Sequence, residues 1–388
     1  QNPFKWLYPG MKVKRWLLIS LLGVIIVGAG AVLTADPYPF VNVVGILWIL
    51  CGMIFIVMGM GKMIVSLLTL FLPKGERELV NILYQKRYLE LIEWLSDDAK
   101  NWATISLIDE DETGPIPKVN VSVKVTALYS QIDEAAWEVS KEAVKERLRP
   151  IFSKAIDRGV FINLDMEQYA HKDFILETFL ELINEVPYKT YRHWGVVIQA
   201  YLRDSLADAK RLCEAAVRRN VPFTVRLVKG AYWDFEVIYA QQKGWPIPVY
   251  LQKKESDANF EDCAKQFIDQ HPSIRLAVGS HNVRSIAAAL SYADSKGLDP
   301  RALEVQMLYG MADPIKRALV RDGVRLREYA TIGELIPGMA YLVRRLLENT
   351  SNESFLRSKF AENISTDTLL RDPHDALSPS SAITPTSG

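Results

Sequence analysis

Cysteine is scarce in this sequence, and an excess of charge of either sign is absent. Its 388 residues hold three cysteines, Cys51, Cys213 and Cys263, none of them at the C-x-x-C spacing of a zinc or redox site. Because the number of cysteines is small and odd, the sequence excludes a disulfide framework and favours a chain that faces the reducing cytosol. Lys and Arg together number 46, as do Asp and Glu, and no basic run is interleaved with aromatic residues. The composition therefore gives no argument for nucleic acid as a partner.

The motifs of several enzyme classes are missing as well. HExxH, GxSxG and P-loop patterns do not occur, so no motif supports a metalloprotease, a serine hydrolase or a nucleotide hydrolase. No metal site is predicted. The run GAGAVL at Gly28 is similar to part of a dinucleotide-binding loop. It lies inside a long apolar segment with no strand before it, so we do not interpret it as a nucleotide site.

Two long runs without charge mark the amino-terminal part of the chain. Residues 16–35 and 41–61 are each about 20 residues long, which is the length that spans a bilayer core. Basic residues precede the first run and follow the second, whereas the connecting loop holds Asp36 and no base. By the positive-inside rule, both ends of this hairpin lie in the cytoplasm. We therefore predict a transmembrane helical hairpin over residues 1–75, with the lipid bilayer of the inner or plasma membrane as a partner.

After the hairpin the chain changes character. Residues 76–118 are predicted to form a helix and an acidic linker. From residue 119 onward, short β-type runs alternate with helical runs, which indicates parallel strands joined by helical crossovers. The predicted strands are VNVSVKVTAL, GVFINLDME, WGVVIQAYL, FTVRLVKGAY, IRLAVGSHN, LEVQMLYGM and VRLREYATIGEL.

The number of predicted strands decides between two α/β architectures. Seven strand-helix repeats are more than a small doubly wound sheet contains, and they are one fewer than the eight of a closed (β/α)8 barrel. We therefore predict a (β/α)8-type, TIM-like barrel over residues 119–362, on the cytoplasmic side of the membrane. Residues 363–388 are predicted to be a disordered polar tail, because they are rich in Pro, Ser and Thr.

Four consecutive predicted strands carry a strongly polar residue near the carboxyl end of one face. These residues are Lys124, Asp165, Gln199 and Arg226. Active sites of barrels are built at this end, from the tips of several strands. A single such residue is as often a polar group satisfied by a loop, but four in register, two of them cations that are costly to bury unpaired, favour a site. A lone His281 in VGSHN is more often a loop histidine than a catalyst.

A later segment, YLVRRLLENTSNESFLR, carries two adjacent arginines. On a helix, Tyr341, Arg344, Arg345 and Glu348 share one face at i, i+3, i+4 and i+7. Paired guanidinium groups offer planar forks of donors that match a carboxylate or a phosphate. The alternative is a solvated helix face with snorkelling arginines. The position after the last predicted strand, near a polar barrel mouth, favours an anion site.

Together these stretches resemble a known family. VKVTALYS, NLDME, VIQAYLRDS, RLVKGAYWD, VGSHN and YLVRRLLENTSNESFLR are similar, in order and spacing, to the proline dehydrogenase domain of bacterial bifunctional proline-utilization enzymes. The resemblance covers roughly residues 88–362. It implies a flavoprotein on a distorted (β/α)8 barrel that oxidises L-proline to Δ1-pyrroline-5-carboxylate, reduces FAD and passes the electrons to a membrane quinone.

Position by position, the resemblance implies two overlapping sets of site residues. Those around the substrate are Lys124, Asp165, Arg226, Tyr232, Leu308, Tyr329, Tyr341, Arg344 and Arg345. Those around FAD are Gln199, Arg226, Val228, Gly230, Trp233, His281, Asn282, Gln306 and Glu348. In this scheme Arg344 and Arg345, helped by Lys124, hold the proline carboxylate. Arg226 lies near the reactive flavin nitrogen, where its charge stabilises the reduced ring.

The sequence departs from that family at both ends. The strand and turn of D-x-L-G-E-A type that open the family barrel are missing, so the predicted barrel lacks its first strand. In their place, roughly the first 90 residues resemble the membrane-bound amino terminus of cyanobacterial gluconeogenesis-factor proteins, which indicates a fusion. At the other end stands SPSSAITPTSG, and we expect no aldehyde dehydrogenase domain in this chain.

The missing strand has a consequence for function. It leaves sheet edges unpaired and the site open to water, so we expect weak flavin binding unless the helix over residues 76–94 covers the gap. The alternative function is a membrane-tethered, non-catalytic barrel remnant or fusion product that binds no flavin. Flavin absorbance of the purified protein distinguishes the two.

Overall fold

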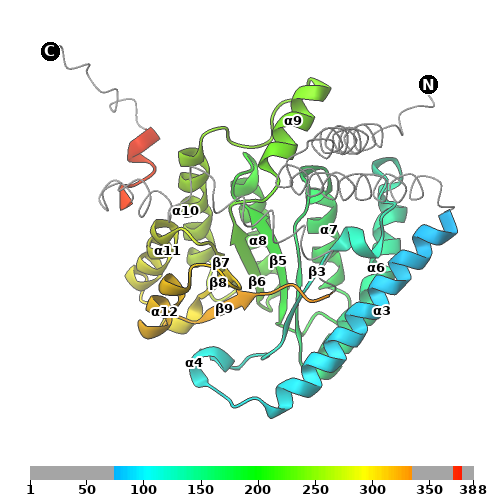
Figure 1. The fold of residues 1–388 in the computed structure, drawn as a ribbon, viewed down its shortest axis with the longest axis horizontal. Helices are drawn as coiled ribbons and strands as arrows, with labels where there is room; N and C mark the ends of the chain where they lie inside the picture. The colour runs from blue at the N-terminus through cyan, green and yellow to red at the C-terminus, as the bar shows by residue number, and fades with distance from the viewer. Residues whose placement is uncertain (1–73, 334–369, 378–388) are drawn as a thin grey trace, which may run out of the picture. The chain divides into compact units, whose positions relative to one another are not determined.

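The computed structural model describes residues 74–333 and 370–377 (Figure 1). The chain divides into two units, residues 1–80 and 81–388, and nearly all of the described residues belong to the second. The two expected membrane-spanning runs and most of the expected tail lie outside the described residues. Within the described part, no helix is both long enough and apolar enough to cross a bilayer.

Seven parallel strands, hydrogen-bonded in chain order, form the central sheet. They are β3 (Asn120–Val123), β4 (Phe161–Leu164), β5 (Trp194–Gln199), β6 (Phe223–Val228), β7 (Ile274–Gly279), β8 (Glu304–Leu308) and β9 (Leu326–Tyr329). Each of them lies within one of the seven predicted strands. The prediction of seven parallel strands is therefore confirmed.

Helices connect the strands, and most of them pack on the outer face of the sheet, whereas α9 stands out beyond the end of the sheet (Figure 1). The longer ones are α3 (Lys74–Asp98), α6 (Trp137–Arg158), α7 (Lys172–Leu182), α8 (Ser205–Arg219), α9 (Trp233–Lys243), α10 (Lys253–Asp269), α11 (Val283–Ser295) and α12 (Asp313–Arg321). Short helical turns are α4 (Ser106–Asp109), α5 (Val125–Leu128), Ala99–Asn101, Glu134–Ala136, Tyr169–His171, Pro300–Ala302 and Asp375–Leu377.

The strand register gathers polar residues on the inner face of the sheet. Ser122 of β3 pairs with Asn163 of β4, and Asn163 pairs with Gly195 of β5. A Cβ atom at Gly195 would lie 2.5 Å from Asn163 Oδ1, so any larger residue here would displace the Asn163 side chain. The alternate residues, such as Val123 and Leu164, are fully buried under the helices. This is the period-two alternation that barrel strands require.

Side-chain contacts show that the sheet curls strongly. Strands in a flat sheet lie about 4.8 Å apart, so β6 and β3 would be separated by roughly 14 Å, and β9 and β4 by roughly 24 Å. Instead, Arg226 of β6 donates to Ser122 Oγ of β3 at 3.0 Å. Tyr329 of β9 donates its hydroxyl to Asp165, just after β4, at 3.2 Å. The inner face therefore encloses the interior of a half-barrel.

A (β/α)8-type barrel was expected, and the structure confirms an α/β half-barrel with seven parallel strands. β3 and β9 are the two edges of the sheet, and within the described residues they do not pair with each other. In the part of the chain that the structure describes, the sheet is thus open between its first and last strands, as the expected lack of the first barrel strand implies.

Helix α3 packs beside α6 and near the edge strand β3 (Figure 1). Ile92 is fully buried in the main core, and Glu93 pairs with Lys154 of α6 at 2.6 Å. The hydroxyl of Tyr88 accepts a hydrogen bond from the backbone N–H of Lys124, directly after β3, at 3.2 Å. This helix, named above as one segment that would have to cover the gap for flavin to bind well, therefore reaches the carboxyl end of β3.

The segment expected to be an acidic linker contains α4 and a two-stranded hairpin, β1 (Glu110–Asp111) and β2 (Gly114–Pro115). The hairpin lies against the amino ends of the barrel strands. Asp111 pairs with Arg275 of β7 at 2.8 Å, and the carbonyl of Glu110 accepts from Arg325, just before β9, at 3.2 Å. The acidic residues of this segment therefore neutralise cations at the amino end of the sheet.

Candidate active site

Three predicted site residues meet inside the curled sheet, at the carboxyl ends of the strands. Arg226 donates through Nη1 to one carboxylate oxygen of Asp165 at 2.8 Å. Tyr329 donates to the other oxygen of Asp165 at 3.2 Å, and Cζ of Arg226 lies 5.5 Å from the centre of the Tyr329 ring. The sequence predicted these three residues from β4, β6 and β9, and the structure brings them into one cluster.

The guanidinium group of Arg226 is buried but not fully bonded. The residue is 7% exposed, and its Nε atom has no hydrogen-bond partner within the described part of the chain. Asp165 supplies one negative charge, and Ser122 accepts a hydrogen bond from Nη2. Because a buried donor without an acceptor is costly, Nε is a position where a ligand atom would be favourable.

Gln199, the last residue of β5, offers a second unused atom. Its register partner on β6 is Val228, so it lies on the strand next to Arg226. The Nε2 atom of Gln199 donates to the carbonyl of Glu167 at 3.2 Å, whereas its Oε1 is buried without a partner among the described residues. This end of the sheet thus holds an unused acceptor as well as an unused donor.

Sequence reasoning missed Glu167. Its carboxylate accepts from the backbone N–H of Thr126 at 3.0 Å and from the Thr126 hydroxyl, so it ties the segment after β4 to the segment after β3. The available signal was the NLDME stretch, in which a second carboxylate follows Asp165 by two positions.

Lys124 is exposed at the carboxyl end of β3, where a ligand could reach its side chain. Its backbone N–H donates to the hydroxyl of Tyr88. Burial raises the pKa of Tyr88 to about 12, against the opposing effect of that N–H. The phenol is therefore protonated at neutral pH, and it holds the backbone of Lys124 in place.

On β7 and β8, two predicted residues contact each other. Nε2 of His281 accepts from the backbone N–H of Leu308 at 2.9 Å. Asn282 caps α11, because its side chain accepts from Arg284 N at 2.9 Å and Ser285 N at 3.3 Å. Gln306 is buried and donates to Glu304 at 2.6 Å. The contacts of His281 and Asn282 position the loop after β7, whereas the contact between Gln306 and Glu304 lies within β8.

The turn from β6 into α9 holds four more predicted residues. Val228 ends β6, and Tyr232 occupies the N-cap position of α9. Gly230 has a φ of 133°, and a Cβ there would lie 2.4 Å from the ring of Tyr201, so only glycine fits. The indole N–H of Trp233 donates to the carbonyl of Tyr250 at 2.8 Å.

Lys229, which sequence reasoning passed over, lies between Val228 and Gly230 in the RLVKGAYWD stretch. Burial lowers the pKa of its ammonium group to about 8, and the ion pair with Asp257 partly offsets that effect. The signal for this residue was its position inside a predicted site motif. The remaining predicted residues, Tyr341, Arg344, Arg345 and Glu348, lie outside the described residues.

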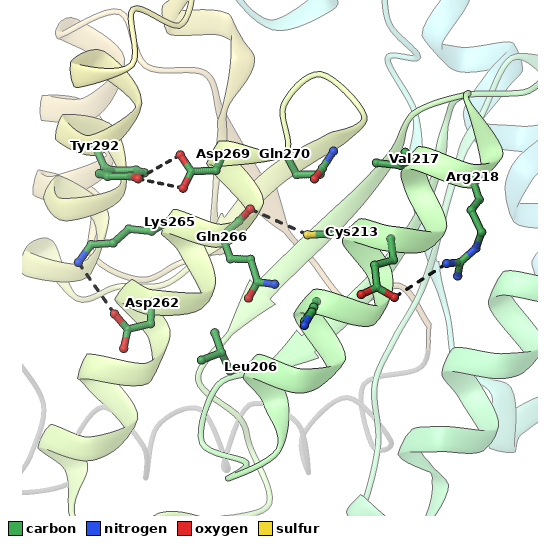
Figure 2. Close-up of a pocket in the computed structure, with 12 residues that line it drawn as sticks. Leu206, Cys213, Val217, Arg218, Asp262, Lys265, Gln266, Asp269, Gln270 and Tyr292 are labelled. Atoms are coloured by element: carbon green, nitrogen blue, oxygen red, sulfur yellow. Dashed lines mark hydrogen bonds and ion pairs between the residues drawn. The ribbon is translucent and has the colours of Figure 1, made fainter.

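A groove of about 840 Å³ lies on the outer face between α8 and α10, apart from the inner-face cluster (Figure 2). Its charged groups are partly paired with one another, as between Arg218 and Glu214 at 3.9 Å. Burial raises the pKa of Cys213 in this groove to about 11, so its thiol is not activated as a nucleophile. We do not interpret this groove as the active site.

Within the described residues, Glu261, Asp372 and His374 place potential metal-ligand atoms within 4.8 Å of one another. Arg284 already binds both carboxylate oxygens of Glu261, at 2.9 and 3.0 Å. His374 contacts Asp372 at 2.9 Å and Asp262 at 3.0 Å. We interpret this group as an ion-pair network that attaches residues 370–377 to α10 and α11.

Comparison with known proteins identifies the family. Residues 77–358 match the proline dehydrogenase family. The chain is 32% identical over 264 residues to the bifunctional protein PutA of Klebsiella aerogenes, covering 66% of this chain and 20% of that protein. It is 30% identical over 252 residues to the proline dehydrogenase of Deinococcus radiodurans, covering 65% of this chain and 72% of that protein. The chain belongs to the proline dehydrogenase family.

Solved structures agree with this assignment. Proline utilization A from Bdellovibrio bacteriovorus, inactivated by N-propargylglycine, superimposes with a TM-score of 0.77 and 57% identity, covering 80% of this chain and 32% of that chain. A Bradyrhizobium japonicum proline utilization A variant gives a TM-score of 0.69 and 27% identity, covering 80% and 31%. The seven-stranded half-barrel is consistent with the distorted barrel of these relatives. The chain spans 20% of the first curated relatives' length, so activity does not follow from membership alone.

Proposed function

We propose that this chain is a proline dehydrogenase, a FAD-dependent oxidoreductase that converts L-proline to Δ1-pyrroline-5-carboxylate. The observation that carries the proposal is the cluster of Arg226, Asp165 and Tyr329, which lies at the carboxyl ends of the strands in a chain of this family. Barrel enzymes build their active sites at that end of the sheet.

Two buried polar atoms at the carboxyl end of the sheet are of the kinds that can form hydrogen bonds with a flavin ring. Gln199 Oε1 is a buried acceptor and Arg226 Nε a buried donor, both without a partner in the described part of the chain. A flavin ring carries an N–H donor as well as carbonyl and ring-nitrogen acceptors, so it could satisfy both. When bound, the flavin would take the hydride that leaves the substrate ring carbon, while a proton leaves the ring nitrogen. The residues proposed to hold it are Gln199, Arg226, Val228, Gly230, Trp233, His281, Asn282, Gln306 and Glu348.

The substrate carboxylate is proposed to bind Lys124, Arg344 and Arg345. Holding a small ring by its carboxylate at several points fixes the reacting carbon, so hydride transfer loses little orientational entropy in reaching its transition state. The residues proposed to surround the ring are Asp165, Tyr232, Leu308, Tyr329 and Tyr341. Arg226 would stabilise negative charge on the reduced cofactor, because a preorganised cation in a buried site acts more strongly than one in water.

Membrane attachment is a further part of the proposal. Residues 1–75 would anchor the chain as a hairpin in the inner or plasma membrane, with the barrel in the cytoplasm and a membrane quinone as electron acceptor. The two uncharged runs and their basic flanks support this topology. The resemblance of the first 90 or so residues to gluconeogenesis-factor proteins supports an origin by fusion. A cysteine placed at Pro37 should react with an impermeant reagent outside intact cells, and a cysteine placed after Lys74 should not.

Substitution of the arginine pair tests the proposed activity. Arg344→Met or Arg345→Met should raise the KM for proline about 10- to 150-fold, because a hydrogen bond to a charged group contributes about 1.5–3 kcal/mol. Flavin content should change little. Arg218→Met, on the outer face of α8, is the matched control and should leave KM unchanged. An unaltered KM in both variants would contradict the assignment.

A second candidate function is a barrel remnant that binds no flavin. The edges at β3 and β9 favour it, because among the described residues they pair with no further strand and leave that part of the sheet open. The hydrogen bond between Tyr88 and Lys124 opposes it, since α3 then supports the backbone at the open edge.

A further inference from the structure

The helical turn α5 begins directly after Lys124 and is not capped by that residue. Lys124 occupies the N-cap position, and within the described structure its side chain makes no cap hydrogen bond. An ammonium group has no acceptor to offer, whereas the first N–H groups of a helical turn need one. Ser, Thr, Asp or Asn usually provides it at this position. The lysine at the end of β3 therefore leaves a backbone donor that another part of the chain has to satisfy.

Glu167 supplies that acceptor from the segment that follows β4. One of its carboxylate oxygens accepts from the backbone N–H of Thr126, the second residue of α5, at 3.0 Å, and the other accepts from the Thr126 hydroxyl. Glu167 is only 9% exposed. A carboxylate is costly to bury unless donors meet it, and here each of its oxygens has one. A buried charge thus fixes a threonine that lies two positions after Lys124.

The backbone around Lys124 is held from two sides. Tyr88 accepts the N–H of Lys124 at 3.2 Å, and Glu167 accepts the N–H of Thr126. The N–H of Asp165 donates to the carbonyl of Val123 at 2.9 Å, which keeps the segment after β4 in line with the end of β3. The ammonium group of a lysine lies at the end of a flexible four-carbon stem. Its reach therefore depends on where these contacts hold the backbone.

The backbone of Glu167 also contacts the flavin side of the proposed site. Its carbonyl accepts from Nε2 of Gln199 at 3.2 Å. This contact sets the orientation of the Gln199 amide, so that Oε1 is the buried atom without a partner among the described residues. The carboxylate of Glu167 thus acts on the lysine segment, and its carbonyl acts on Gln199.

We propose that Glu167 is a positioning residue for the substrate carboxylate. It holds the backbone beside Lys124 in the place from which the ammonium group meets that carboxylate, and it acts through Thr126 rather than on the reacting atoms. The inference rests on the proposed function and adds a residue to it. If a loosened segment occupied the binding position about a tenth of the time, the apparent affinity would fall about tenfold.

The first test separates binding from turnover. Glu167→Gln keeps the size and the backbone of the residue but removes the charge, so the KM for proline should rise about 5- to 20-fold. The value of kcat and the flavin content should change little, because a contact made in both the ground state and the transition state affects KM alone. Glu142→Gln, on an exposed part of α6, is the matched control and should leave KM unchanged.

Two competing ligands show which part of the substrate is affected. Tetrahydrofuran-2-carboxylate has the ring and the carboxylate of proline, but a ring oxygen replaces the N–H, so it cannot be oxidised to an imine. Pyrrolidine has the ring nitrogen and no carboxylate. In Glu167→Gln, the inhibition constant of the first should rise by the same factor as KM, whereas that of pyrrolidine should hardly change. Equal weakening of both ligands would contradict a role directed at the carboxylate.

Thr126 provides a milder variant if Glu167→Gln does not fold. Thr126→Val removes the hydroxyl and keeps the backbone N–H, so KM should rise about 2- to 5-fold. Thr126→Ser keeps both donors and should restore the original KM. In the double variant the two effects should not add, because both changes act on one interaction. An unaltered KM in Glu167→Gln and Thr126→Val, or fully additive effects, would overturn the proposal.

Hydrogen exchange of the unliganded full chain gives a readout without turnover. In Glu167→Gln the amide of Thr126 should exchange about 10-fold faster. The amide of Arg284, which Asn282 caps in α11, is the matched control and should not change. If the unaltered chain binds no flavin and oxidises no proline, the proposed function fails. The Thr126 amide then still decides whether Glu167 holds this segment, and an unchanged exchange rate would refute it.

Discussion

The two ends of the seven-stranded sheet are both lined with charge, yet they use it differently. At the amino end, Asp111 pairs with Arg275 at 2.8 Å and Glu304 with Arg327 at 2.9 Å. At the carboxyl end, Arg226 has a single carboxylate partner among the described residues, and Lys124 is exposed. An arginine Nε without a partner among the described residues occurs at both ends, at Arg226 and at Arg275 and Arg325. What distinguishes the carboxyl end is the exposed lysine and the buried acceptor Gln199 Oε1, which also has no partner among the described residues.

The pKa values at the amino end agree with a structural role. Burial would raise the pKa of Glu304, but Arg327 and Arg325 outweigh that effect and lower it, so the carboxylate stays ionised. Burial, with the nearby cations Arg192 and Arg275, lowers the pKa of His193 to about 3. This histidine is therefore neutral in the physiological range and is poorly suited to exchange protons there.

The largest predicted effect is on stability, at the amino end. Glu304→Gln removes the charge that neutralises Arg327 and Arg325, so unfolding should become easier by about 3 kcal/mol. A lower thermal midpoint in calorimetry measures this loss. Asp165→Asn, at the carboxyl end, should lower the midpoint less and reduce proline oxidation more. Equal stability losses in the two variants would remove the distinction between the ends.

The second effect is on catalysis, at the carboxyl end. Arg226→Met should lower the rate of proline oxidation about 100- to 1000-fold, because it removes a preorganised cation from the proposed flavin site. Steady-state assays with a soluble dye measure the rate. Arg226→Lys keeps the positive charge and should retain part of the activity. A full rate in the methionine variant would exclude Arg226 from the site.

A smaller effect is predicted at the boundary between α3 and β3. Tyr88→Phe removes the acceptor for the backbone N–H of Lys124, so the KM for proline should rise about 2- to 10-fold. Proline titrations of the variant measure it, and Tyr84→Phe, on an exposed part of α3, should leave KM unchanged. If both variants behave alike, α3 does not support the substrate end of β3.

The smallest effect concerns pH and the segment of residues 370–377. Burial alone would lower the pKa of His374, but hydrogen bonds to Asp262 and Asp372 outweigh it and raise the pKa above 6.5. The stabilising contribution is therefore complete below the unfolded pKa and is lost as the pH rises through the raised folded pKa. Amide hydrogens of this segment should exchange faster above that pKa, after correction for the intrinsic rate. His374→Gln should remove the pH dependence, and its persistence would assign the effect to another group.

The sequence was sufficient to predict the strands and to place several candidate site residues at one end of the sheet. Alternation of valines with Ser122 and Lys124 marked the inner face of β3, and parallel pairing then placed Asp165 and Arg226 at the same end of one sheet. These are local patterns with a period of two, which short segments carry on their own.

Contacts that depend on curvature could not be predicted in the same way. The hydrogen bond between Tyr329 and Asp165 joins β9 to the end of β4, and it requires a degree of curl that no single strand encodes. Tyr88 looked like one more residue of an amphipathic helix until the packing of α3 placed it beside Lys124. The role of the acidic segment likewise depends on Arg275, which lies 164 positions after Asp111.

The central claim is that the carboxyl end of this open half-barrel binds a flavin and presents proline to it. The most direct measurement is the visible absorbance of the purified chain, first alone and then with proline under anaerobic conditions. We expect equimolar FAD and loss of the flavin absorbance on addition of proline. A colourless protein that neither takes up added FAD nor responds to proline would contradict it.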